Sequence, residues 1–97
     1  MDVKEIMQLW LDRLKVDGPA VYHEKIYEEL FELGQAITHF RLDKVGYDEL
    51  AEEIADVYMQ MEKLLSVHSH VTLATKVQNI KARKYLQLQR MTYGKEH

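Results

Sequence analysis

Two acidic segments are the part of this 97-residue sequence best suited to chemistry. The segment EELFELGQAI, residues 28–37, is nearly repeated 24 residues later by EEIADVYMQM, residues 52–61. In each segment two acids lie three residues apart, which places them on neighbouring turns of one helical face. These pairs are Glu29 with Glu32 and Glu53 with Asp56.

The chemistry expected of two such pairs is cation binding. If the two helices pack antiparallel, equivalent positions are related by a local two-fold axis, and the pairs converge. Clustered carboxylates repel one another, so they take up protons or bind cations. Oxygen ligands favour Mg²⁺, with Mn²⁺ as the alternative, over zinc. A di-iron centre is disfavoured because no histidine follows an acid at the Glu-x-x-His spacing.

The elements that position these acids are expected to be helices of a single domain spanning residues 1–97. One proline and four glycines leave few breaks, and no alternating strand pattern competes. The segments VDGP, LDKVGYD and HSH are the predicted breaks, and Asp48 is the predicted N-cap of the third helix. The predicted helices cover residues 3–15, 19–41, 48–67 and 71–91.

Apolar spacing predicts how these helices pack. The first helix carries an apolar face of Ile6, Leu9, Trp10 and Leu14. The second and third helices carry seams at spacings of four and three residues, in the same register. The predicted fold is therefore an all-α four-helix bundle, with both acid pairs flanking the seams. The seam residues are Ile26, Leu30, Leu33, Ile37 and Phe40, and then Leu50, Ile54, Val57, Met61 and Leu64.

The acidic residues also resemble a known family signature. Glu28-Glu29-x-x-Glu32, a gap of 20 residues and Glu53-x-x-Asp56 are similar to the EExxE and ExxD motifs of the MazG-like all-α nucleoside triphosphate pyrophosphohydrolases. The resemblance covers about residues 20–65. It implies Mg²⁺-dependent hydrolysis of a nucleoside triphosphate to the monophosphate and pyrophosphate. It also implies that Glu29, Glu32, Glu53 and Asp56 hold the metal, and that Glu28 is a further catalytic candidate.

Residues outside the acidic motifs are candidates for contacts with the nucleotide. The segment KVQNIKARKY resembles the family's phosphate-facing positions, which here fall on Lys76, Asn79 and Arg83. Relatives place side chains from the first helix against the base, and this implicates Trp10. An exposed basic face and a core tryptophan are the plain structural alternatives for these residues.

Composition narrows the class of protein. The chain has no cysteine, which excludes disulfides, thiolate metal sites and a catalytic thiol, and indicates a cytoplasmic protein. It has no membrane-length apolar run and no secretory signal pattern, so no membrane partner is expected. A chain this short buries a small core, which favours a homodimer or a tetramer.

Two alternative functions remain open at this stage. The net charge of −3 divides into −8 for residues 1–64 and +5 for residues 65–97. A helical adaptor that binds nucleic acid through its basic last third is one alternative, but it leaves the repeated acid motif unexplained, so nucleic acid is disfavoured. The other is a phosphoribosyl-ATP pyrophosphohydrolase, although its expected serine-tyrosine-threonine segment is absent near the start.

Overall fold

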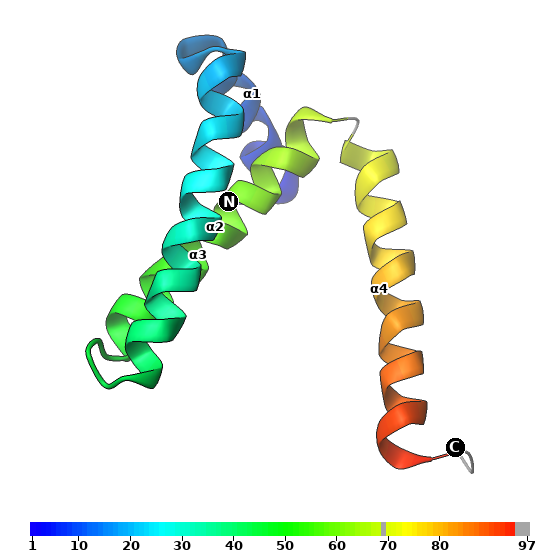
Figure 1. Cartoon of the computed structure of the whole chain (residues 1–97). Coiled ribbons are helices and arrows are strands. Elements are labelled where there is room, and N and C mark those ends of the chain that lie inside the picture. Colours follow the sequence, from blue (N-terminus) through cyan, green and yellow to red (C-terminus); the bar gives the residue numbers. More distant parts are fainter. Residues whose placement is uncertain (69, 95–97) are drawn as a thin grey trace.

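The structure is a computed structural model that describes residues 1–68 and 70–94. This part of the chain contains four α-helices and no strand, which confirms the predicted all-α class (Figure 1). None of the described helices is long and apolar enough to cross a membrane. Ser69, part of the predicted HSH break, lies outside the described residues. The helices are α1 (Val3–Asp17), α2 (Pro19–Arg41), α3 (Tyr47–Val67) and α4 (His70–Tyr93).

Local sequence explains where these helices begin and end. The Asp2 carboxylate accepts a hydrogen bond of 2.8 Å from the backbone N–H of Glu5, which caps α1. Gly18, with φ of +82°, is the only residue between α1 and α2, and its lack of a Cβ permits this sharp reversal. The prediction of Asp48 as N-cap was wrong. The cap of α3 is Gly46, because the Glu49 carboxylate reaches back and accepts from the Gly46 N–H at 3.0 Å.

Three helices pack together and the fourth stands apart. Helices α1, α2 and α3 contact one another, whereas in the described residues α4 contacts α3 alone and extends away from the others (Figure 1). The radius of gyration is 16.9 Å, against about 12.5 Å for a compact chain of this length. The accessible surface is 7939 Å², against about 5,800 Å² for a compact monomer of 11.5 kDa. A single chain therefore exposes much more surface to solvent than a compact monomer does.

The buried side of α2 differs from the predicted seam. Leu30 and Ile37, both predicted to face α3, are each 46% exposed. Glu29 and Ala36 are buried in their place, and Ile54 of α3, also predicted in a seam, is 37% exposed. The reason is that α2 carries two apolar stripes, and the stripe that contains Glu29 is the one turned inward. Its members are Tyr22, Ile26, Glu29, Leu33, Ala36 and Phe40, again spaced four and three apart.

The first helix packs largely as expected. Ile6, Trp10 and Leu14 are half-buried, as predicted for the apolar face of α1. Leu9 is exposed instead, and Leu11 takes its place on the half-buried side. This places the indole of Trp10 beside the first turns of α2 and the last turns of α3.

Helix α4 has two different faces. Leu73 and Ala74 at its N-terminal end are half-buried, and the same apolar stripe continues through Val77, Ile80 and Leu88, which are 40 to 52% exposed. At about 100° per residue, a sector of about 60° beside this stripe carries three of the five basic residues of α4, whereas Lys81 and Lys84 fall within the stripe itself. That sector holds Lys76, Asn79, Arg83 and Arg90, and α4 contains no acidic residue.

Candidate metal centre

The two acid pairs meet between α2 and α3 through Glu29, which is grouped with both acids of the second pair, whereas Glu32 is grouped only with acids of α2. Carboxylate oxygens of Glu29, Glu53 and Asp56 can all lie within 4.8 Å of one another. A second group with the same spacing is formed by Glu28, Glu29 and Glu32 on α2. Glu29 belongs to both groups, so the five acids form one continuous cluster.

Burial distinguishes the acids within this cluster. The Glu29 side chain is nearly enclosed, with 6% of the residue exposed, because the inward stripe of α2 includes it. Glu32, Glu53 and Asp56 are half-buried, and Glu28 is exposed. Oxygens Oε2 of Glu29 and Oε2 of Glu53 are inaccessible to solvent and accept no hydrogen bond from any described residue. Buried carboxylate oxygens normally have a partner, so these two lack one that a cation would supply.

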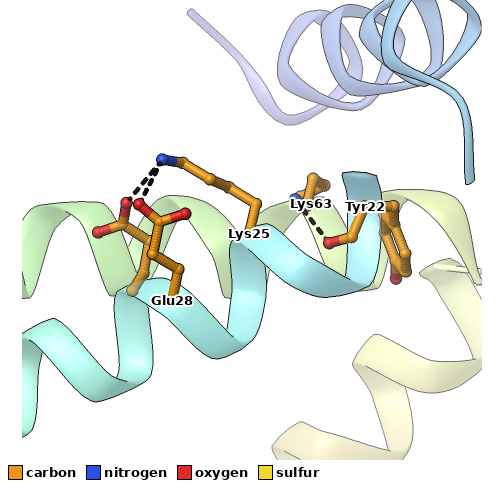
Figure 2. Close-up of polar contacts among 5 residues, drawn as sticks. Tyr22, Lys25, Glu28 and Lys63 are labelled. Atoms are coloured by element: carbon orange, nitrogen blue, oxygen red, sulfur yellow. Dashed lines mark hydrogen bonds and ion pairs between the residues drawn. The ribbon is translucent and has the colours of Figure 1, made fainter. Parts of the chain in front are cut away.

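Lys25 is a partner of the cluster that the sequence analysis missed. Its ammonium lies 3.4 Å from a carboxylate oxygen of Glu28 and 3.3 Å from one of Glu29 (Figure 2). Hydrogen bonds to Glu29 and Glu28 raise the pKa of Lys25, so it stays charged. The available signal was its position four residues before Glu29 on the same helical face.

Electrostatic repulsion within the cluster appears in the pKa of two acids. Partial desolvation, followed by the charges of Glu29 and Asp56, raises the pKa of Glu53. Desolvation, followed by the charges of Glu29 and Glu53, raises the pKa of Glu32. Both shifts mean that the negative charges lack sufficient compensation, even with Lys25 present. An all-oxygen set that is short of positive charge suits a hard divalent cation.

The candidate residues of α4 do not join this cluster within one chain. Lys76, Asn79 and Arg83 are exposed, and α4 makes no contact with α2 in the described residues. These three residues do share one side of α4, as the sequence analysis expected. Their contact with a substrate stays a prediction, and it requires either a second chain or a movement of α4.

A pocket of about 460 Å³ adjoins the acidic cluster. Its walls come from α1, the start of α2 and the second half of α3, and Trp10 is among them. Lys25 lines the pocket and also pairs with Glu28 and Glu29, so the pocket and the cluster are neighbours. Its size lies within the range of small-molecule sites. Trp10 is thus placed where a ligand could contact it.

Two buried polar residues in this pocket were not foreseen from the sequence. Lys63 and Gln60 are each 7% exposed and lie on the inward side of α3. The Lys63 ammonium donates a hydrogen bond of 3.2 Å to the backbone carbonyl of Tyr22 (Figure 2). The available signal was spacing, since Lys63 follows Asp56 by seven residues, two helical turns along one face.

Comparisons of the chain with models of protein families, with curated proteins and with solved structures found no match. The case for a function therefore depends on the geometry and chemistry of this site.

Proposed function

We propose that the chain is a Mg²⁺-dependent nucleoside triphosphate pyrophosphohydrolase that releases a monophosphate and pyrophosphate, in a role of nucleotide-pool house-cleaning. One observation carries the proposal. The carboxylates of Glu29, Glu53 and Asp56 converge within 4.8 Å, and two buried oxygens of this group accept no hydrogen bond from the described residues. A nucleoside triphosphate suits such a site, because phosphoryl transfer requires metal ions that neutralise the negative charge on the phosphate oxygens.

The acids have distinct roles in this proposal. Glu29, Glu32, Glu53 and Asp56 hold the cation, with Mn²⁺ as an alternative to Mg²⁺. When bound there, the metal would supply charge neutralisation of the phosphate oxygens and a lower pKa for a water that attacks. Glu28 is the exposed member of the cluster and lies beside Glu29 under the same Lys25 ammonium, so it is the proposed proton acceptor.

The proposal includes self-association as a homodimer or tetramer. The accessible surface of the chain is about 2,100 Å² larger than that of a compact monomer of the same mass, which supports this association. The excess is more than the roughly 800 Å² that each partner buries in a standard interface. The uncovered surface includes Leu30 and Ile37 on α2 and Val77, Ile80 and Leu88 on α4. In such an assembly, Lys76, Asn79 and Arg83 of one chain are proposed to meet the phosphates held by the acids of another.

The test compares two neighbouring glutamates that differ in burial. Glu53→Gln removes a charged ligand of the cluster, whereas Glu52→Gln makes the same chemical change at an exposed neighbour. Pyrophosphate release is measured over a panel of ribo- and deoxynucleoside triphosphates and phosphoribosyl-ATP, with and without Mg²⁺. We expect Glu53→Gln to lose at least about 10-fold in activity and most of its stabilisation by Mg²⁺, and Glu52→Gln to lose little. Equal activity in the two variants would contradict the metal assignment.

A nucleic-acid adaptor is the second candidate, and the exposed cationic side of α4 favours it. The described part of α4 has five Lys and Arg side chains and no acid. Binding through phosphate contacts would weaken steeply with added salt. Oligonucleotide binding by a chain that hydrolyses no triphosphate in the panel would support this candidate.

A further inference from the structure

Lys63 is a buried cation without a carboxylate partner. Within residues 1–68 and 70–94, no carboxylate oxygen lies within 4.0 Å of its ammonium, and its hydrogen bond to the Tyr22 carbonyl uses one of three donors. Burial lowers the pKa of Lys63, the charge of Asp17 partly opposes this, and Lys25 adds to it. Burying such a group is costly unless a partner compensates for its lost hydration. The rings of Trp10 and Tyr22, over which the ammonium lies, compensate part of this cost. Two of its three N–H donors still have no acceptor among the described residues, and a ligand group that accepts hydrogen bonds would satisfy them.

The surroundings of Lys63 suit a flat ring. Its Nζ lies 5.6 Å from the ring centroid of Trp10 and 5.1 Å from that of Tyr22. Leu14 and Met59 supply apolar wall on other sides of the 460 Å³ pocket. A planar heterocycle can cover these apolar surfaces and still present a polar edge to the ammonium.

Gln60 supplies the complementary half of that edge. It lines the same pocket one helical turn before Lys63, and its Oε1 has no hydrogen-bond partner among the described residues. The pocket thus offers an ammonium, which only donates, and a carboxamide, which accepts through its oxygen and donates through its amino group. A ring edge with a carbonyl oxygen next to an N–H satisfies both groups.

This pattern separates the nucleobases into two classes. Thymine and guanine present a carbonyl oxygen, O4 or O6, where cytosine and adenine present an amino group. An amino group brings a second donor to the Lys63 ammonium, which cannot accept, whereas the Gln60 amide can turn and donate to a ring nitrogen that carries no hydrogen. The discrimination therefore comes from Lys63, whose buried donors would be left unsatisfied by cytosine or adenine.

We propose that Lys63 and Gln60 form a specificity pocket for a cyclic amide edge, so that the bases accepted are uracil, thymine, guanine and hypoxanthine. The recognition of the base stands on the pocket alone, whereas the claim that the ligand is a triphosphate rests on the function proposed above. The geometry connects the two sites through Lys25, which lines the pocket and pairs with Glu28 and Glu29. A base in the pocket and phosphates at the acids are therefore compatible with one ligand.

The test uses free nucleosides, which carry no phosphate. The metal-free wild-type chain is titrated with uridine, inosine, cytidine, adenosine and N3-methyluridine, and binding is followed by NMR chemical shifts. We expect uridine and inosine to bind roughly 10- to 100-fold more tightly than cytidine and adenosine, and N3-methyluridine, which lacks the N–H, to bind as weakly as cytidine. Equal binding of uridine and cytidine, or no saturable binding of uridine and inosine, would overturn the proposal.

Variants separate recognition from packing. Lys63→Met keeps the length of the side chain and is expected to remove the preference for uridine while leaving cytidine binding unchanged. Lys15→Met on the exposed side of α1 is the matched control and should keep the preference. An equal loss for every nucleoside, or competition between uridine and inorganic phosphate, would show that Lys63 packs or binds anions instead. If Lys63→Met does not fold, the wild-type comparison still decides.

The outcomes also separate this inference from the proposed function. Base-selective nucleoside binding without any triphosphate hydrolysis would retain the pocket and reject the enzyme. Hydrolysis that is indifferent to the base would retain the enzyme and reject the pocket.

Discussion

Replacing Ile80 by lysine is expected to dissociate the proposed assembly into single chains. Ile80 lies midway along the apolar stripe of α4 and is 42% exposed in one chain. Val77 and Leu88 continue the stripe, and Lys81 and Lys84 line the same shallow groove. If a second chain covers this stripe, the new ammonium is buried among apolar groups and existing cations, with no acid on α4 to pair with it.

The size of the effect follows from that burial. An uncompensated charge inside an interface costs about 3 kcal/mol or more, which raises the dissociation constant of a dimer at least about 150-fold. The chain exposes about 2,100 Å² more surface than a compact monomer of its mass. This excess is large enough for an interface that the new charge can disrupt. A dimer stable at micromolar concentration should therefore become largely monomeric.

Light scattering coupled to size-exclusion chromatography measures this directly. The wild-type chain should have a mass of at least twice 11.5 kDa, and Ile80→Lys should approach 11.5 kDa. Ala82→Lys is the matched control, because it adds the same side chain at an exposed position on another face of α4. A wild-type mass of one chain, or equal dissociation by both variants, would refute the reasoning.

Three further predictions concern the acids, the cations of α4 and the glycines. The pKa values of Glu53 and Glu32 are raised, so above pH 4.5 the folded chain retains protons that the unfolded chain has released. The contribution of these two groups to the free energy of unfolding of the metal-free chain therefore falls as pH rises. The increase in Tm with Mg²⁺ should therefore be larger at pH 7 than at pH 5, and equal increases would contradict the repulsion described. Arg83→Ala should raise KM or lower kcat alike for every nucleotide, because phosphate contacts carry no information about the base; unchanged hydrolysis would remove Arg83 from the site. Gly34→Ala should stabilise α2 by about 1 kcal/mol in chemical denaturation, since an added Cβ meets no atom within 4 Å, whereas Gly18→Ala should destabilise by about 1–3 kcal/mol because of its positive φ.

Sequence reasoning was most successful where local signals determine the structure. The helix bounds followed from breaks such as Gly18-Pro19, and the acids converged because their spacing and register repeat in α2 and α3. The choice between the two apolar stripes of α2 was not local. By residue type, Leu30 is more suitable for burial than Glu29. Glu29 is nevertheless the buried residue, because α3 packs against the side of α2 that carries it.

The pocket was the part of the site least accessible to sequence reasoning. Lysine is rarely fully buried, so the residue type of Lys63 outweighed the one signal for its burial, its seven-residue spacing from Asp56. Its burial depends on α1 crossing the end of α3, which is a contact between segments more than 40 residues apart. The position of α4 was similarly unpredictable, because its apolar stripe is equally suited to its own chain or to another.

The double pairing of Lys25 would couple metal binding at the acidic cluster to ligand binding in the pocket, in the function proposed above. One ammonium is shared between the carboxylates of Glu28 and Glu29, and it also forms part of the pocket wall. A divalent cation at Glu29, as proposed, would compete with the Lys25 ammonium for the same oxygens and repel it, so that the Lys25 side chain could turn toward a ligand in the pocket. Binding at either location then changes affinity at the other by the same factor, as reciprocity of linked equilibria requires. If the proposed metal binds at Glu29, Lys25 would be an internal counterion, and its displacement would change the charge at the pocket wall.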